Sequence, residues 1–217
     1  MVSRHLKDLL IARCSMGLDE YANHGIGETI NCPNGGQLIY RDNGAKVLAV
    51  AHLDYVGWTN PHFTRKGRRI NAMQLDDRLG AWVILDLLFS LGLDTDEYDI
   101  LLCDMEEVGD STAQFFKPKK QYNWVFEFDR RGTDFVSYQY SDTDLPSLYS
   151  GVTKSSEGCG AFSDISYLGH LEAAAINIGV GYHNAHTHYC YADLEDTLRQ
   201  AANFVEFFKL FKDDHFA

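Results

Sequence analysis

The sequence predicts an α/β protein: a three-layer αβα sandwich around a central, largely parallel mixed sheet. Apolar runs with little alternation are typical of central strands covered on both faces, and they occur at 99–105, 123–129 and 173–181. Segments with a helical pattern lie between these runs. Strands that alternate with helices along the chain are typical of a parallel sheet covered by helices. The length of 217 residues suits one domain, so we expect residues 1–217 to form a single unit.

The first half of the chain is predicted to contain a helix, a hairpin and a second helix. Residues 5–14 have the pattern of a short amphipathic helix. The stretch 36–56 is typical of a β-hairpin, because the apolar runs GQLIY and VLAVAHLDYV flank a turn signal at Asn43-Gly44. Residues 78–92 are apolar almost all round, so we expect this helix to be buried on most sides.

The last segment carries the clearest helical signal. Apolar residues recur there at spacings of one helical face, at Leu194, Leu198, Ala201, Val205 and Phe208. Asp193 stands where a helix N-cap is expected.

Composition excludes several kinds of partner. The net charge of −12 argues against nucleic acid, because phosphate contacts need Lys and Arg, and it suits cations instead. No apolar run approaches the length of a membrane span, so we expect no membrane association. The five cysteines are scattered without a C-x-x-C pair, which favours free thiols and a cytoplasmic protein.

Metal-capable residues follow the ends of four predicted strands. In a parallel sheet these ends meet at one edge, where ligands bind. The candidates are His52 and Asp54, Glu106 and Glu107, Asp129, and the group His183, His186 and His188, with Asp76 and Asp77 just before the buried helix. Counting one ligand from each place gives five, namely His52, Asp76, Glu107, Asp129 and His186. Five are too many for one catalytic zinc, which keeps about three protein ligands, but they suit two ions that share a carboxylate.

Several of these residues have a plainer interpretation. Spacing alone does not choose among the three histidines of the HNAHTH segment. Asp77 stands where a helix N-cap is common. Asp129 precedes Arg130 and Arg131, so an ordinary salt bridge is the alternative to metal binding. Glu127 should face the same side as Asp129 but lie deeper, and no role is assigned to it.

Five motifs carry a resemblance to a known family. AHLDYVG, LDDRLG, MEEVG, FEFD and NAHTHYCYADLED together resemble the co-catalytic dinuclear zinc exopeptidase superfamily, which holds peptidase T, glutamyl aminopeptidases and zinc carboxypeptidases of the same fold. The resemblance covers the chain from residue 47 to the C-terminus.

The resemblance implies a role for each matching residue. It implies that one divalent ion is held by His52, Asp76 and Asp129, and the other by Asp76, Glu107 and His186, with Asp76 bridging. Glu106 is then the general base, and Asp54 supports the site beside His52. The implied ions are two Zn²⁺, with Co²⁺ or Mn²⁺ as substitutes.

The resemblance also bears on substrate contacts. Relatives line their substrate pocket with a segment comparable to GCGAFSDISYLG, which implies contacts from Ser163 and Asp164; a tight turn that caps a short helix is the equal alternative. His183 is an alternative substrate contact. Many relatives carry an inserted lid or dimerisation domain, and the intervals 52–76 and 129–186 are too short to hold one.

We therefore expect an aminopeptidase acting on short peptides. A carboxypeptidase or an N-acyl amino-acid deacylase of the same fold is the nearest alternative, so the expected substrate is a small peptide or an acylated amino acid. The rival from another class is a catalytically inactive metal-binding module. Loss of the general base is its usual mark, and Glu106 is present here.

Overall fold

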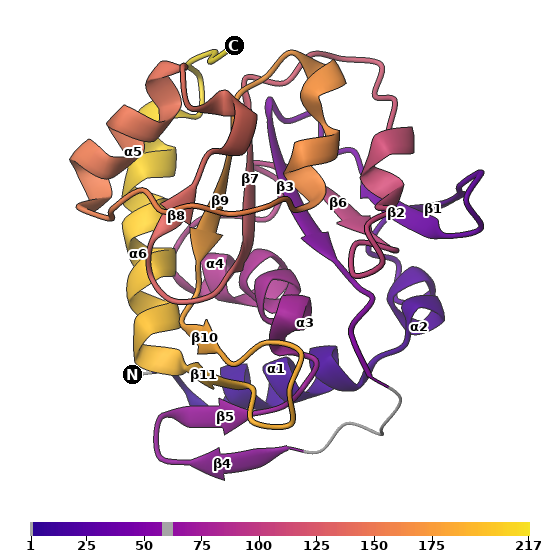
Figure 1. Ribbon diagram of the computed structural model, residues 1–217, viewed down its shortest axis with the longest axis vertical. Coiled ribbons are helices and arrows are strands. Elements are labelled where there is room, and N and C mark those ends of the chain that lie inside the picture. The colour runs from indigo at the N-terminus through magenta and orange to yellow at the C-terminus, as the bar shows by residue number, and fades with distance from the viewer. Residues whose placement is uncertain (1, 58–62) are drawn as a thin grey trace.

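The computed structural model describes residues 2–57 and 63–217. A mixed β-sheet lies at the centre of the described structure (Figure 1). Within it, seven strands pair in the order β1 (Glu28–Asn31), β2 (Gln37–Arg41), β6 (Asp99–Cys103), β3 (Val47–His52), β7 (Trp124–Arg130), β9 (Ala175–Gly179) and β8 (Phe135–Val136). The four strands β6, β3, β7 and β9 are parallel to one another. The predicted α/β fold with a largely parallel sheet is confirmed.

Different kinds of helix cover the two faces of the sheet. The side chains of β7 point alternately to the two faces. On one face, the rings of Phe126 and Phe128 pack against Phe204, with centroid distances of 4.4 and 5.1 Å respectively. On the other face, Glu127 contacts Ser163. On the first face, α3 (Leu75–Trp82) contacts β3 and β7, and α6 (Leu194–Phe211) contacts β9. The π-helix η1 (Val83–Leu87) and α4 (Leu88–Ser90) continue α3 and pack against α6. The second face carries short 3₁₀ helices: η2 (Thr112–Phe115), η4 (Asp164–Tyr167) and η5 (Gly169–Leu171).

The predicted helices are present. Residues 5–14 lie in α1 (Arg4–Ser15), which packs on α3 and is followed by α2 (Leu18–Asn23). Of the apolar segment 78–92, residues 78–90 lie in the continuous run of α3, η1 and α4, and most of the segment is buried. Helix α6 begins where predicted, because the Asp193 carboxylate accepts a hydrogen bond from the backbone N–H of Glu195.

The predicted hairpin at 36–56 is wrong. Strands β2 and β3 do not pair, because β6 lies between them, antiparallel to β2 and parallel to β3. The Asn43 side chain donates hydrogen bonds to the carbonyls of Thr95 and Tyr98, and the buried Asp99 carboxylate accepts the N–H groups of Asn43 and Ala45. The loop between β2 and β3 is therefore hydrogen-bonded to the start of β6 and the residues before it. It does not form the two-residue turn of a hairpin.

A second, smaller sheet lies below the main one in Figure 1. Its strands pair in the order β10 (Tyr182–His183), β11 (Tyr191–Asp193), β5 (Arg69–Asn71) and β4 (Thr64–Lys66). The remaining elements are η3 (Tyr138–Tyr140) and α5 (Asp144–Thr153). None of the helices in the described ranges is both long and apolar enough to cross a lipid bilayer.

Candidate metal centre

The carboxyl ends of the parallel strands bring the candidate ligands together. His52 ends β3, Asp129 is the penultimate residue of β7, and Glu107 lies in the loop after β6. Asp76 reaches them from the start of α3, and His186 from the loop between β10 and β11. The side chains form two groups that share Asp76, and each group has the donor atoms to hold a metal ion.

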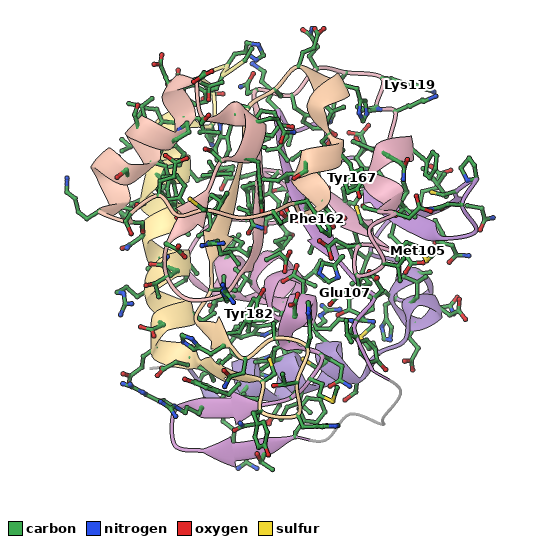
Figure 2. The ribbon with its side chains drawn as sticks, viewed as in Figure 1. Met105, Glu107, Lys119, Phe162, Tyr167 and Tyr182 are labelled. Carbon is green, nitrogen blue, oxygen red and sulfur yellow. The ribbon has the colours of Figure 1, made fainter. Side chains whose placement is uncertain are left out.

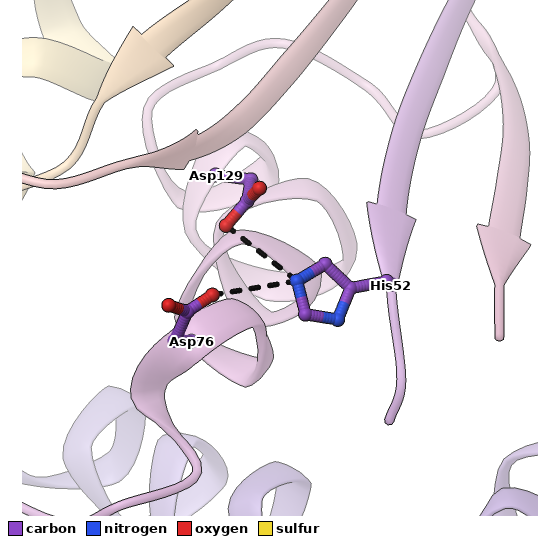
Figure 3. A group of neighbouring side chains, drawn as sticks. All are labelled: His52, Asp76 and Asp129. Atoms are coloured by element: carbon purple, nitrogen blue, oxygen red, sulfur yellow. Dashed lines mark ion pairs between the residues drawn. The ribbon is translucent and has the colours of Figure 1, made fainter. Parts of the chain in front are cut away.

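The first group is His52, Asp76 and Asp129 (Figure 3). The fully buried imidazole of His52 directs Nε2 at two carboxylates, with Asp76 Oδ1 at 3.3 Å and Asp129 Oδ1 at 3.6 Å. Nδ1 lies 3.1 Å from the carbonyl oxygen of Asp54 and 3.3 Å from its Oδ1. When the ring is neutral and carries its proton on Nδ1, beside these oxygens, the Nε2 lone pair faces the two carboxylates of Asp76 and Asp129.

The second group is Asp76, Glu107 and His186. His186 Nε2 lies 3.1 Å from Asp76 Oδ2 and 2.9 Å from Glu107 Oε2. The two carboxylate oxygens of Asp76 therefore face different imidazoles, Oδ1 toward His52 and Oδ2 toward His186. An acid in this position can be shared between two cations.

Asp54 connects the loops that follow β3 and β6. Its Oδ1 accepts the backbone N–H of Glu106 at 3.3 Å, and its Oδ2 accepts that of Glu107 at 3.0 Å. The same carboxylate lies beside His52 Nδ1, as is usual for a carboxylate that orients a ligating imidazole. Asp54 thus holds one histidine and two glutamates in position.

Crowded acids dominate the electrostatics of the centre. Burial raises the pKa of Glu106 to about 8 and that of Glu107 to about 7. The Asp76 carboxylate raises the pKa of His186 to about 8. Burial is the largest single influence on His52 and favours its neutral form, but the carboxylates of Asp129, Asp54 and Asp76 together outweigh burial and raise the pKa of His52 well above its usual value. The site therefore attracts positive charge, either as protons or as metal ions.

The side chains of Ser163 and Asp164 have buried partners. Ser163 Oγ donates to Glu127 Oε2 at 2.5 Å, and Ser111 Oγ donates to Asp164 Oδ1. All four residues are fully buried. Both Ser163 and Asp164 stand at the start of η4, as in the capping alternative, and a contact with substrate stays a prediction. Sequence reasoning gave Glu127 no role, and its contact with η4 had no signal in the sequence.

The remaining candidates belong to neither of the two groups. The ring of His183 packs against Tyr191, with centroids 5.0 Å apart, and His188 is exposed. Asp77 Oδ1 accepts the backbone N–H of Gly80 at 3.0 Å, which is the capping role. Arg130 forms its ion pair with Asp134, at 2.7 Å, and not with Asp129.

Tyr182 is a residue of the centre that sequence reasoning missed. Its side chain is buried, and its hydroxyl donates to the carbonyl oxygen of Asp129 at 3.3 Å. A cavity of about 670 Å³ is lined by Tyr182, His186 and Phe162, among others. Tyr182 and Phe162 are labelled in Figure 2. A lone tyrosine in an apolar run carries no signal that would have pointed to this position.

Sequence comparisons identify no relative. No protein-family model matches the chain, and no curated protein matches it.

Solved structures are similar in three dimensions. The aminopeptidase PepT from Bacillus cereus superposes with a TM-score of 0.68 at 10% identity, over 93% of this chain and 96% of that chain. A tripeptidase from Staphylococcus aureus gives 0.69 at 9% identity, over 94% and 97%. A Zn-dependent exopeptidase from Parabacteroides distasonis gives 0.55 at 14% identity, over 96% and 89%. The chain has the fold of these peptidases. The fold implied by the sequence motifs is therefore confirmed.

Proposed function

We propose that this chain is a dinuclear metal-dependent peptidase of the zinc exopeptidase superfamily, and that it acts as an aminopeptidase on short peptides. The observation that carries the proposal is the position of the Asp76 carboxylate. One of its oxygens faces His52, and the other faces His186. The similarity to solved aminopeptidases and a tripeptidase supports the choice of reaction.

The donor atoms fit divalent cations. His52 Nε2 is buried without a hydrogen-bond partner although two carboxylate oxygens lie within 3.6 Å, and Glu107 Oε1 is also buried and unpartnered. A cation between these atoms would satisfy them together. We assign His52, Asp76 and Asp129 to one ion, and Asp76, Glu107 and His186 to the other. Mixed imidazole and carboxylate ligands suit Zn²⁺, and they accept Co²⁺ or Mn²⁺.

The chemistry divides between the ions and Glu106. Bound divalent ions supply a water of lowered pKa and polarise the carbonyl of the scissile amide. Glu106 Oε2 lies 3.9 Å from His52 Nε2, so its carboxylate borders the first group. In the metal-free protein, burial raises the pKa of Glu106 to about 8, so this side chain holds a proton more readily than an exposed glutamate does. We assign it to take a proton from the attacking water and to deliver it to the leaving amine.

Two further expectations belong to the proposal. We propose that residues 1–217 form one catalytic unit without an inserted lid, since the described part of the interval between His52 and Asp76 holds only the β4–β5 hairpin as regular structure. We also propose a cytoplasmic location, because all five cysteines are free thiols and four of them are buried.

A panel of substrates tests the function. The protein is loaded with zinc, cobalt or manganese, with a chelator-treated sample as control, and given aminoacyl-amides, di- and tripeptides, C-terminally free N-blocked peptides and N-acetyl amino acids. We expect metal-dependent release of N-terminal residues, and two bound ions per chain by elemental analysis. Tight metal binding without turnover of any substrate would contradict the proposal and favour the inactive module. Turnover confined to blocked peptides or acetylated substrates would replace the aminopeptidase by its nearest alternatives.

A further inference from the structure

The cavity beside the metal centre has an unusual charge for this protein. The chain carries 31 acidic residues against 19 basic ones, yet no Asp or Glu lines the cavity among the described residues. The charged side chains that do line it are Arg130 and Arg131, together with His186 of the second group. A cationic group of a substrate would find no counter-charge on these walls.

The two arginines differ in what they bind. Arg130 is held by Asp134, with Nε donating to Oδ1 at 2.9 Å and Nη2 donating to Oδ2 at 2.7 Å. Arg131 is exposed, and the described part of the chain offers it neither an ion pair nor a hydrogen bond. Its guanidinium therefore keeps all of its donors available at the edge of the cavity.

The other walls suit a small organic substrate. Tyr138, Phe162 and Tyr182 line the cavity, and 46% of Phe162 is exposed. The volume of about 670 Å³ lies in the range of small-molecule sites, which are mostly apolar with a few polar groups that fix orientation. His186 belongs to both the cavity wall and the second metal group, so a molecule in the cavity reaches the centre.

We propose that Arg131 binds a carboxylate of the substrate in this cavity. The inference rests on the proposed function and adds a substrate class to it: peptides that place a carboxylate beside the metal centre. Arg is suited to this task because its planar guanidinium forms paired, charge-assisted hydrogen bonds with a carboxylate. The carboxylate comes either from an acidic side chain at the N-terminus or from the C-terminus of a dipeptide.

Substrate pairs separate these two sources. Glu-Ala-amide and Gln-Ala-amide differ only in the side-chain carboxylate, and Ala-Ala and Ala-Ala-amide differ only in the C-terminal one. For the pair whose carboxylate Arg131 binds, we expect Arg131→Gln to raise KM about 10- to 100-fold for the charged member, and to leave kcat and the neutral member nearly unchanged. Arg131→Lys, which keeps the charge but not the paired donors, should recover part of the loss.

Arg4→Gln is the matched control, since it removes the same charge from an exposed site on α1, outside the cavity. An equal KM change for charged and neutral substrates, or the same change in both variants, would overturn the proposal.

A binding measurement keeps the test independent of turnover. Glutarate is titrated calorimetrically into the zinc-loaded protein, its Arg131→Gln variant and the Arg4→Gln control. We expect Arg131→Gln alone to weaken glutarate binding about 10-fold or more. Equal binding by all three proteins would overturn the role of Arg131 even in an active peptidase. Selective weakening without hydrolysis of any peptide would support that role and contradict the proposed function instead.

Discussion

The carboxylate of Asp54 accepts the backbone N–H of Glu107 at a distance of 3.0 Å. This bond joins the end of β3 to the loop after β6, so residues distant in the chain share one rigid support. The remaining Asp54 oxygen accepts the N–H of Glu106 and lies beside His52. The groups assigned to metal binding and to proton transfer are therefore positioned by the same side chain.

Replacing Asp54 should weaken metal binding without unfolding the protein. Asp54→Ala removes the carboxylate beside His52 Nδ1, which is also the acceptor of two backbone N–H groups, while the backbone carbonyl near Nδ1 remains. Loss of such a supporting group typically costs 10–100-fold in metal affinity or activity, and we expect about that loss in a chelator competition assay. Asp142→Asn, at an exposed acid outside the site, is the control. Wild-type affinity and activity in Asp54→Ala would show that Asp54 does not support the site.

Replacing Glu106 should separate metal binding from turnover. Glu106→Gln keeps the size of the side chain but removes the group that accepts a proton. Because Glu106 is assigned to neither ion, we expect two ions per chain and a loss of kcat of about 10²- to 10⁴-fold. Elemental analysis and steady-state kinetics on the same preparation check both values. A wild-type kcat would remove Glu106 as the base.

The histidines of the loop should differ in their effect on metal content. His186 faces Asp76 and Glu107, whereas His183 packs on Tyr191. We therefore expect His186→Ala to lower the content from two ions to one after dialysis, and His183→Ala to retain two. Asp76→Ala should lose both ions, because both groups use its carboxylate. Two ions in His186→Ala would transfer the ligand role to another residue.

Metal affinity should fall as the pH is lowered from about 8 to 6. In the metal-free protein the pKa of His186 is raised to about 8 and that of Glu107 to about 7, so below these values both hold protons. A cation must displace these protons, and it binds more weakly the more of them are present. Calorimetry in two buffers of different ionisation enthalpy measures the protons released. Affinity that is constant over this range would contradict the assignment of both residues as ligands.

The contact between Gly80 and Asp77 should control the start of α3. A Cβ atom added to Gly80 would overlap the carboxylate of Asp77, so the two could not both keep their positions. We expect Gly80→Ala to lower the free energy of unfolding by about 1–3 kcal/mol, as overpacking does, and to weaken metal binding through the neighbouring Asp76. Gly151→Ala is the control, because Gly151 is an exposed glycine of α5 with open space where a Cβ atom would lie. It should be neutral or slightly stabilising. Equal stability of the two variants would contradict this account.

Elements with a local signal were predictable from the sequence. The spacing of Leu194, Ala201 and Phe208, together with the cap at Asp193, predicted α6 correctly, because helix periodicity and capping act within a few residues. The hairpin failed for the opposite reason. Asn43-Gly44 is a local turn signal, but the carbonyls of Thr95 and Tyr98 and the carboxylate of Asp99 bind this connection from more than fifty residues away.

The sequence pattern was enough to locate the parallel strands and the acids and histidines at their ends. Strands that are buried on both faces appear as apolar runs, and the polar residues that follow each run mark where the strand ends. Which of these polar residues contact one another was decided only by the tertiary structure. Asp76 faces two imidazoles, and Ser163 is buried against Glu127. Arg130 forms an ion pair, whereas Arg131 has none among the described residues. These relationships depend on distances between side chains far apart in sequence, and no local pattern encodes such distances.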